Sequence, residues 1–465
     1  MNLWVKKRPE DLLQASEQTQ LRKSLRAVDL AALGIGSVVG TGIFVATGQG
    51  AHLAGPGVLL SFIIAAITAG LCALTYSELA SMFPVAGSTY SYSYAAFGEV
   101  IAWIIGWDLM LEYLVSASAV ASGWSTTFMG LLENLGVKLP KAISLTPLAG
   151  GIVDLPAILI TLLITWILYL GIRESSVTNN IIVVIKVAVI VLFIVLGISH
   201  VNLNNLTPFA PFGWKGIMSG AAIIFFAYIG FDAVSTAAEE TINPKRDVPL
   251  GLMICLGVVI ILYVGVAFVL TGVVPFQEID VGNALPAALA RIGIQWGGAL
   301  VATGGIIGMI STLLITVYGQ VRIFMVMARD GLLPEVFSRV HPKHRTPVIC
   351  TWITGALTAI IAGFFPLGVI IELCNIGTLF AFVLVSVGVI VLRHTQPQVE
   401  RKFRTPLVPF TPLITIGFCL YLMTNLPILT WVRFVVWLGA GLIIYFIYGL
   451  HHSKLQKRFN AKNQP

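Results

Sequence analysis

Residues 34–44 read Gly34-Ile-Gly36-Ser-Val-Val-Gly40-Thr41-Gly42-Ile-Phe44, and this stretch decides the fold. It lies within an apolar segment, residues 27–53, that is long enough to cross a bilayer as a helix. Each glycine weakens a helix by up to about 1 kcal/mol and reaches backbone conformations that other residues avoid. We therefore predict a first transmembrane helix that is broken at Gly40-Thr41-Gly42.

A break at this depth leaves backbone groups without partners inside the helix. In hydrocarbon each unpaired group costs on the order of several kcal/mol, so these groups must face protein or a ligand. The carbonyls that end the first half-helix suit an ammonium, and the amides that begin the second suit a carboxylate. The break therefore predicts a zwitterion site. The alternative is close helix packing through the Gly36-x-x-x-Gly40 spacing.

The composition excludes a water-soluble protein. Hydrophobic residues make up 57% of the 465 residues, charged residues 11%, and the mean hydropathy is +0.91. Soluble domains contain about 25% charged residues, so the solvent of this chain must be the bilayer. We predict a single all-α integral-membrane domain over residues 27–450, a cytoplasmic segment over residues 1–26 and a cytoplasmic tail over residues 451–465.

The apolar segments predict about twelve spans. They lie near residues 27–53, 57–82, 98–130, 154–173, 179–199, 214–240, 248–274, 295–328, 347–365, 368–393, 408–427 and 430–450. Most connections between them are short; the exceptions are residues 131–153, 200–213 and 275–294 outside, and 329–346 and 394–407 inside. Residues 283–293 are predicted to form a small helix across the outer mouth. The basic connections, 394–407 among them, are interpreted as solvated topology signals.

The basic residues orient these spans. Of the 28 Lys and Arg residues, 22 lie on the side of the two termini, five lie on the opposite side and Lys186 lies inside a span. The positive-inside rule places both termini in the cytoplasm. The same asymmetry accounts for the net charge of +7 without a nucleic acid partner. The basic residues 1–26 lack an apolar core and a small-residue cleavage site, so we expect an uncleaved anchor rather than a signal peptide.

The sixth span is interrupted like the first. It reads Phe225-Phe226-Ala227-Tyr228-Ile229-Gly230-Phe231-Asp232. Five spans separate the two interruptions, so the halves enter the membrane in opposite orientations, and such pairs mark transporter binding sites. The carbonyls of Phe226, Ala227 and Ile229 are predicted to meet an ammonium. Phe226 is either a gate over the ligand or ordinary core, and Asp232 is either a proton-coupling acid or a helix cap.

Two ionisable residues lie deep inside spans. Lys186 is flanked by apolar residues on both sides, where a charge costs at least about 2.5–3.5 kcal/mol and indicates function. We predict that it holds the carbonyls of the first break, either as a fixed cation or as one that releases and rebinds a proton; the alternative is snorkelling to the interface. Glu112, midway along the third span, is predicted as a proton site or a counter-charge for the substrate, with structural pairing as the alternative. Asp108 lies one helical turn from Glu112, closer to the cytoplasm, and is a weaker candidate for either role.

Met309 lies near the middle of the eighth span. It is predicted either to form part of the pocket wall or to be an ordinary core residue. The turn after the eighth span, Arg329-Asp330-Gly331-Leu-Leu-Pro334, is predicted as a capped helix end near an inner gate. The five cysteines and seven histidines show no metal-ligand spacing, so we expect no metal and no cofactor.

These residues resemble the amino acid–polyamine–organocation superfamily, and within it the bacterial relatives of the cationic amino acid transporters. The resemblance runs from about residue 24 to 450 and rests on residues 34–44, Ala54-Gly55-Pro56, Phe83-Pro84-Val-Ala-Gly87-Ser88, Ala227-Tyr228-Ile229-Gly230-Phe231-Asp232, Glu240-Thr-Ile-Asn243-Pro244 and Arg329-Asp330-Gly331-Leu-Leu-Pro334.

The resemblance implies a five-plus-five inverted repeat (LeuT-like) with two added helices. It implies that substrate backbone groups bind at Val38, Gly40, Thr41, Gly42, Phe226, Ala227 and Ile229. It also implies that Lys186 stands where sodium-coupled relatives hold their second sodium ion. Glu112 and Met309 match pocket positions of the cationic-transporter branch. Few acidic groups other than Glu112 and Asp232 are expected near the pocket. Small neutral, branched-chain and cationic amino acids therefore all remain candidate substrates.

We expect a proton-coupled importer of L-amino acids that works by alternating access in the cytoplasmic membrane, in contact with membrane lipids. The alternatives are an exchanger of amino acids or amines and, further off, an amino acid sensor that does not transport. A channel would need a polar stripe along several spans, and an enzyme would need a nucleophile and base or metal ligands. The sequence shows neither pattern, and it leaves the oligomeric state open.

Overall fold

The computed structural model describes residues 3–7, 23–83, 85, 88–171, 176–341 and 346–462. Most of the predicted segment 1–26 lies outside these ranges. So do several residues used above: the basic residues Arg8, Arg22, Arg173, Lys343 and Arg345, and Pro84 and Gly87 of the motif after the second span.

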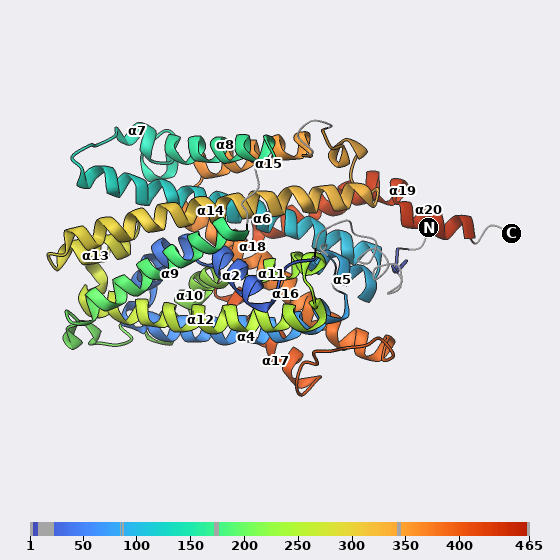
Figure 1. The fold of residues 1–465 in the computed structure, drawn as a ribbon, viewed down its shortest axis with the longest axis horizontal. Helices are drawn as coiled ribbons and strands as arrows, with labels where there is room; N and C mark the ends of the chain where they lie inside the picture. The colour runs from blue at the N-terminus through green and yellow to red at the C-terminus, as the bar shows by residue number, and fades with distance from the viewer. Residues whose placement is uncertain are drawn as a thin grey trace.

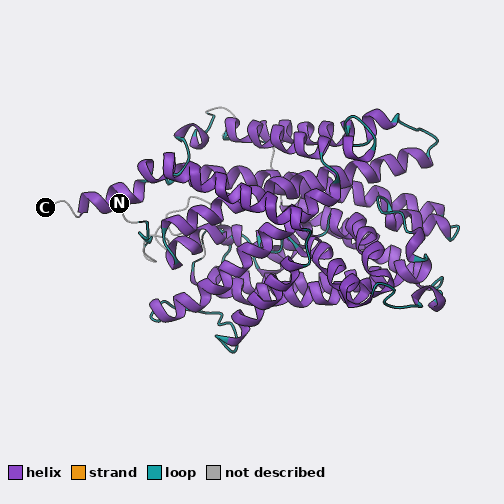
Figure 2. Cartoon of the chain, turned by 180° about the vertical axis from the view of Figure 1, so that it is seen from behind, coloured by secondary structure: helices purple, strands orange, loops and turns teal. Residues whose placement is uncertain are grey.

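The described chain is a bundle of helices, most of them running along the long axis of the molecule (Figure 1, Figure 2), as predicted. The spans are α2 (Ala27–Val38) with η1 (Gly42–Ala46) and α3 (Thr47–Ala54), α4 (Val58–Met82), α6 (Glu99–Asn134), α8 (Leu155–Tyr169), α9 (Ser176–Ile198), α10 (Gly213–Ile224) with η5 (Phe225–Tyr228) and α11 (Ala233–Thr236), α12 (Pro244–Val273), α14 (Gln295–Arg329), α15 (Val348–Phe364), α16 (Leu367–Thr395), α17 (Phe410–Thr424) and α18 (Ile428–Ile444). Among the described residues, eight helical stretches of at least 18 residues are long and apolar enough to cross a membrane, and four apolar helices of 10–17 residues accompany them.

Short helices connect the spans. They are α5 (Ser88–Ala96), α7 (Lys141–Ser144), α13 (Ala284–Arg291), α19 (Leu450–His452) and α20 (Lys454–Lys462). The helix α13 confirms the small helix predicted within residues 283–293. The sequence did not predict α5, because its polar and aromatic residues lack an apolar period and bond to partners outside the helix, one near in the chain and one distant. Tyr94 donates to Glu99 at 3.0 Å and Tyr90 to Asp330 at 2.7 Å.

Both termini lie at one end of the bundle, as predicted (Figure 1). Lys7 forms an ion pair of 2.7 Å with Asp330, which follows the end of α14. The backbone amide of Lys454 donates to the carbonyl of Asp330 at 3.0 Å. The two ends of the chain therefore meet on the same helix end. That this end faces the cytoplasm stays a prediction.

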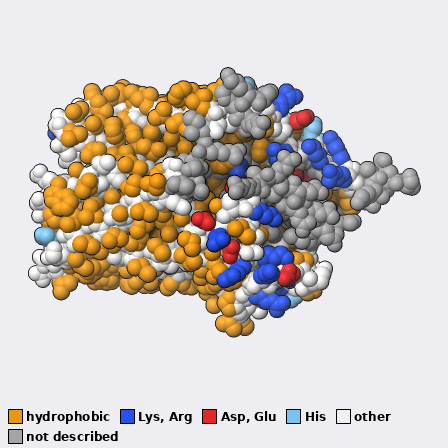
Figure 3. All heavy atoms as spheres, in the orientation of Figure 1, with side chains coloured by type: hydrophobic (Ala, Val, Ile, Leu, Met, Phe, Trp, Pro, Cys, Tyr) orange, Lys and Arg blue, Asp and Glu red, His pale blue; other side chains and the backbone are white. Residues whose placement is uncertain are grey.

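The surface divides along the same axis. In Figure 3 apolar side chains cover most of the face away from the termini, and charged side chains gather toward the end that carries them. Large apolar residues stay exposed along the spans; Ile261 on α12, for example, is 75% exposed. Exposed apolar area costs about 25 cal/mol per Å² in water and nothing comparable in hydrocarbon. This surface therefore fits a bilayer.

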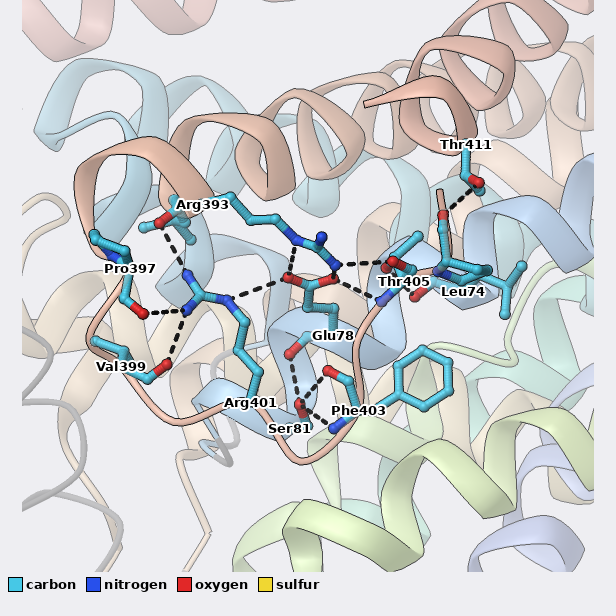
Figure 4. Close-up of polar contacts among 12 residues, drawn as sticks. Leu74, Glu78, Ser81, Arg393, Pro397, Val399, Arg401, Phe403, Thr405 and Thr411 are labelled. Atoms are coloured by element: carbon cyan, nitrogen blue, oxygen red, sulfur yellow. Dashed lines mark hydrogen bonds and ion pairs between the residues drawn. The ribbon is translucent and has the colours of Figure 1, made fainter. Parts of the chain in front are cut away.

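Glu78, near the end of α4, is the centre of a buried ion-pair cluster (Figure 4). Its side chain is 1% exposed. Arg393 donates to both carboxylate oxygens, at 2.9 and 2.8 Å, and the amide of Thr405 donates to Oε2 at 2.8 Å. Nε of Arg401 lies 3.3 Å from Oε1. The interpretation of the connection 394–407 as a merely solvated topology signal is therefore wrong for Arg401, because this side chain is buried against Glu78.

Arg401 is also bonded to the end of the preceding helix. Its guanidinium donates to the backbone carbonyls of Leu392, Gln396 and Val399 at 2.9, 2.9 and 2.8 Å. The connection between α16 and α17 is thus fixed to α4 by paired charges. Only the tertiary structure brings these residues, more than 300 positions apart in the chain, into contact.

Candidate functional site at the paired helix breaks

The first break follows α2. Val39 is extended, with φ −76° and ψ 97°, and the helix resumes as the π-helical turn η1. The freed carbonyls find side-chain partners: the hydroxyl of Tyr263 donates to the carbonyl of Val38 at 3.1 Å. Oγ1 of Thr312 lies 3.2 Å from the carbonyl oxygen of Gly36 and 3.3 Å from that of Val39. The break predicted from the glycines is therefore confirmed, and protein groups satisfy part of it.

The second break follows η5. Ile229 is extended, with φ −64° and ψ 142°, and Gly230 has φ +109°, a conformation that favours glycine. Helix α11 then begins at Ala233. Nδ2 of Asn375 on α16 donates to the carbonyl of Ala222 at 2.7 Å, near the end of α10. The sixth span is therefore interrupted where the sequence predicted.

The two breaks touch each other, and glycines permit the contact. A Cβ built on Gly42 would lie 2.8 Å from Cβ of Ala227. A Cβ built on Gly230 would lie 2.8 Å from Oγ of Ser37. These separations are shorter than ordinary contacts, so a side chain at either position would push the breaks apart. The paired breaks form one structural unit.

Lys186 on α9 connects this unit to α14. Its side chain is completely buried, and Nζ donates to the carbonyl of Gly36 at 2.5 Å and to Oγ1 of Thr312 at 2.8 Å. Gly308 leaves room for the chain, since a Cβ there would lie 2.9 Å from Cγ of Lys186. The amine therefore reaches the first break instead of snorkelling to an interface. Its part in proton coupling stays a prediction.

A cavity of about 270 Å³ leads from the breaks toward the end of the bundle with the termini. Its inner part is lined by Ser37, Glu112, Tyr113, Ser116, Ile229, Gly230, Asp232, Leu314 and Tyr318. At its outer part Asp29, Glu240 and Arg322 contribute charged groups, and Arg322 lies 3.8 Å from Glu240. The cavity is therefore apolar along much of its wall, with carboxylates at both ends.

The structure brings three of the predicted site residues to the cavity wall, namely Glu112, Ile229 and Asp232. The others are buried beside the breaks without lining the cavity: Val38, Gly40, Thr41, Gly42, Phe226, Ala227 and Met309. Oγ1 of Thr41 lies 3.3 Å from Sδ of Met309, so the eighth span packs directly on the first break. Substrate contact by these residues stays a prediction.

Several residues of the cavity wall were not predicted. Ser37 lies inside the glycine-rich stretch itself, Ser116 follows Glu112 by one helical turn, and Asn179 precedes Lys186 by two turns. For Ser116 and Asn179 the signal is a polar residue on the same helix face as a buried charge. Besides charged groups, the remaining unpredicted polar residues of the wall are Tyr113, Asn180, Thr236, Thr316 and Tyr318.

The cavity is more acidic than the sequence indicated. Asp29 and Glu240 join Glu112 and Asp232 along its wall, and Arg322 contributes the one basic group of the described lining. Asp29 and Glu240 lie at the ends of their spans in the sequence, so they were not assigned to a pocket. The surplus of carboxylates favours a ligand that carries a positive group.

Replacing Gly230 by alanine tests the contact between the breaks. A residue with a side chain pays about 1–2 kcal/mol in this left-handed conformation and also meets Ser37. Because about 1.4 kcal/mol is a factor of ten, we expect substrate binding to weaken about tenfold, measured by ligand titration of the purified variant. Gly257→Ala on α12, where a Cβ meets nothing within 4 Å, is the control. Equal affinity of the two variants would contradict the assignment.

Comparison with known proteins identifies one family and several relatives. The family model for amino acid permeases matches residues 25–449. The chain is 48% identical over 462 residues to the branched-chain amino acid permease BcaP of Bacillus subtilis, covering 98% of this chain and 99% of that protein. It is 46% identical over 459 residues to the methylthioribose transporter of Bacillus subtilis, covering 98% and 100%. It is also 40% identical over 411 residues to the vacuolar cationic amino acid transporter 4 of Arabidopsis thaliana, covering 86% and 68%.

Proposed function

The chain belongs to the amino acid permease family and is a transporter rather than an enzyme, and from this premise we propose that it imports L-amino acids together with protons. The proposed location is the cytoplasmic membrane, with both termini in the cytoplasm. With this orientation the cavity opens inward, which is the arrangement expected for an inward-facing state of the proposed alternating-access cycle. The positive-inside distribution of Lys and Arg supports this orientation.

The contact between Lys186 and the first break carries the proposed coupling. The ammonium donates to the carbonyl of Gly36 and to Thr312, and thereby ties α9 and α14 to the end of α2. A neutral amine keeps fewer donors and no charge, so loss of the proton would weaken this tie. Proton release from Lys186 therefore offers a way to loosen α2 within the cycle.

The recognition of an amino acid is proposed to use the breaks and the cavity wall together. The α-ammonium of the substrate would pair with the carboxylates of Glu112 and Asp232. Its α-carboxylate would accept hydrogen bonds from backbone amides at the start of the second half-helix of the first span. Leu33, Leu314 and Ile229 supply apolar wall for a small or branched side chain. The additional carboxylates of Asp29 and Glu240 keep cationic amino acids among the candidates.

Uptake into proteoliposomes tests the proposal. The panel contains alanine, leucine and arginine, and also methylthioribose because a relative of nearly equal identity is named for that compound. A pH difference of one unit is worth about 1.4 kcal/mol per proton, so one coupled proton supports about tenfold accumulation. We expect an amino acid to accumulate when the interior is alkaline, and no accumulation from a sodium gradient at equal pH.

Three other outcomes contradict parts of this proposal. Accumulation driven by sodium alone excludes proton coupling. Uptake that requires amino acid inside the vesicles identifies an exchanger. Accumulation of methylthioribose without any amino acid excludes the proposed substrate class, since that compound lacks the ammonium and carboxylate pair that the site is proposed to bind.

A further inference from the structure

Asp108 on α6 is a buried acid that the proposed coupling through Lys186 does not use. Its side chain has no exposed surface, and within the part of the chain that the structure describes neither carboxyl oxygen has a hydrogen-bond partner. Among the described residues no basic side chain forms an ion pair with it. Two other fully buried acids have partners. Glu78 lies against two arginines and a backbone amide, and Glu99 accepts hydrogen bonds from Tyr94 and Tyr445.

The surroundings of Asp108 are closed, and no basic side chain of the described residues offsets a charge there. Oδ1 faces α16 at Gly377, where a Cβ would lie only 2.9 Å from this oxygen, so the absence of a side chain makes room for the carboxyl. The preceding Trp107 stacks on Trp437 of α18 with ring centroids 4.6 Å apart. Nε1 of Trp107 donates to the carbonyl of Trp437 at 2.8 Å. These contacts seal α6 against α16 and α18.

An ionised carboxylate is unfavourable in such a place. Removing a charge from water without a counter-ion is strongly unfavourable, whereas a neutral carboxyl loses only its hydrogen bonds with water. The geometry therefore indicates that Asp108 is present as the acid, with a proton on one of its oxygens. Such a proton can take part in transport only if it can exchange with water.

Glu112 supplies the connection to water. It follows Asp108 by four positions, so the two side chains are neighbours on one face of α6. Glu112 is 4% exposed and lines the cavity that opens toward the termini. The third span thus carries one acid that is sealed and one that touches the cavity, a single helical turn apart.

We propose that Asp108 and Glu112 form a two-carboxyl proton site, in which Asp108 stores a proton and exchanges it with the cavity through Glu112. In the transfer the O–H bond of Asp108 breaks as the proton binds a carboxylate oxygen of Glu112. The negative charge moves to Asp108 in the same step, and no other reactant is needed. The part of this site in transport rests on the proposed proton coupling; its protonation does not.

Titratable groups on the neighbouring elements frame the pair. The thiol of Cys374 on α16 lies 3.9 Å from the backbone carbonyl of Glu112. Asp232, at the start of α11, lines the same cavity as Glu112, and Arg322 on α14 lies toward its mouth. Lys186 on α9 is engaged with the first break. The charged group that shares the inner cavity with Glu112 is therefore Asp232, whose negative charge favours a proton on the pair.

Infrared difference spectroscopy tests the stored proton without transport. The purified protein at neutral pH is compared with Asp108→Asn, and we expect the wild type to show the carbonyl band of a protonated carboxylic acid that the variant lacks. A wild-type spectrum without such a band, or an unchanged band in Asp108→Asn, overturns the proposal. Thermal unfolding of both proteins checks that the variant is folded.

Transport tests the exchange. Asp108→Asn is expected to lose the tenfold accumulation that one pH unit supports, while counterflow of substrate at equal pH continues. Asp108→Glu, which keeps the acid, is expected to restore accumulation, and Glu133→Gln at the exposed end of α6 is the control. Full pH-driven accumulation in Asp108→Asn overturns the exchange. If the wild type itself shows no pH-driven accumulation, the proposed proton coupling is wrong. The infrared result then still decides whether Asp108 is protonated.

Discussion

Lys186→Met is expected to abolish pH-driven accumulation, from the roughly tenfold gain per pH unit of one coupled proton to none. Methionine has a similar length and apolar stem, so it fills the space beside Gly308. It removes the two hydrogen bonds that Nζ donates to Gly36 and Thr312. The break then loses its cation, and with it the group proposed to change protonation. Uptake into proteoliposomes with and without a pH gradient measures the effect.

Lys186→Arg separates charge from proton release. An arginine keeps the positive charge, but it does not give up its proton within a protein. We expect this variant to bind substrate, as measured by ligand titration, and to fail in pH-driven accumulation. Lys215→Met, which changes an exposed lysine near the start of α10, is the control and is expected to transport like the wild type. Undiminished pH-driven accumulation in Lys186→Met would refute the role of this lysine.

Glu78→Ala is expected to lower the free energy of unfolding by about 3–5 kcal/mol. The substitution leaves Arg393 and the buried Arg401 without their carboxylate, and it removes the acceptor of the Thr405 amide. An uncompensated buried charge is more costly than the loss of the pair itself, which is why the effect is large. Denaturant or thermal unfolding of the purified protein in detergent measures it.

Glu400→Ala is the matched control for Glu78. Glu400 lies in the same connection between α16 and α17 and pairs with Lys245 at 2.6 Å, yet its side chain is 62% exposed. Exposed pairs are screened by water and contribute little to stability. We expect this variant to unfold like the wild type. If both variants shifted the unfolding midpoint equally, the cluster around Glu78 would not stabilise the fold as inferred.

Regular hydrophobic patterns made most of the fold predictable. The spans, the two interrupted helices and the small helix α13 all follow from apolar length, glycine placement and local sequence, which are short-range properties. The common side of the termini follows from an even number of spans. The short helix α5 was missed because it lacks an apolar period and because one of its contacts, from Tyr90 to Asp330, joins residues some 240 positions apart in the chain.

The candidate site was predictable only in part. A charge inside an apolar span is visible in sequence, so Lys186, Glu112 and the glycine breaks were found. The acids Asp29 and Glu240 were not assigned to the pocket, because their positions on its wall depend on how α2 and the sixth span pack against α14. From the sequence, Asp108 is a weaker candidate for a proton site than Glu112. A sequence shows that an acid lies in a span but not whether that acid has a partner.

The sequence by itself therefore determined that this chain crosses the membrane repeatedly, that its first and sixth spans break, and that a lysine lies within the apolar layer. These are properties of single segments and of the cost of burying charge or unpaired backbone. Only the tertiary structure decided that Nζ of Lys186 reaches the carbonyl of Gly36, that Glu78 pairs with two arginines, and that the Asp108 carboxyl has no hydrogen-bond partner among the described residues. Hydrogen bonds and ion pairs act over a few ångströms, so they depend on which distant segments the packing brings together.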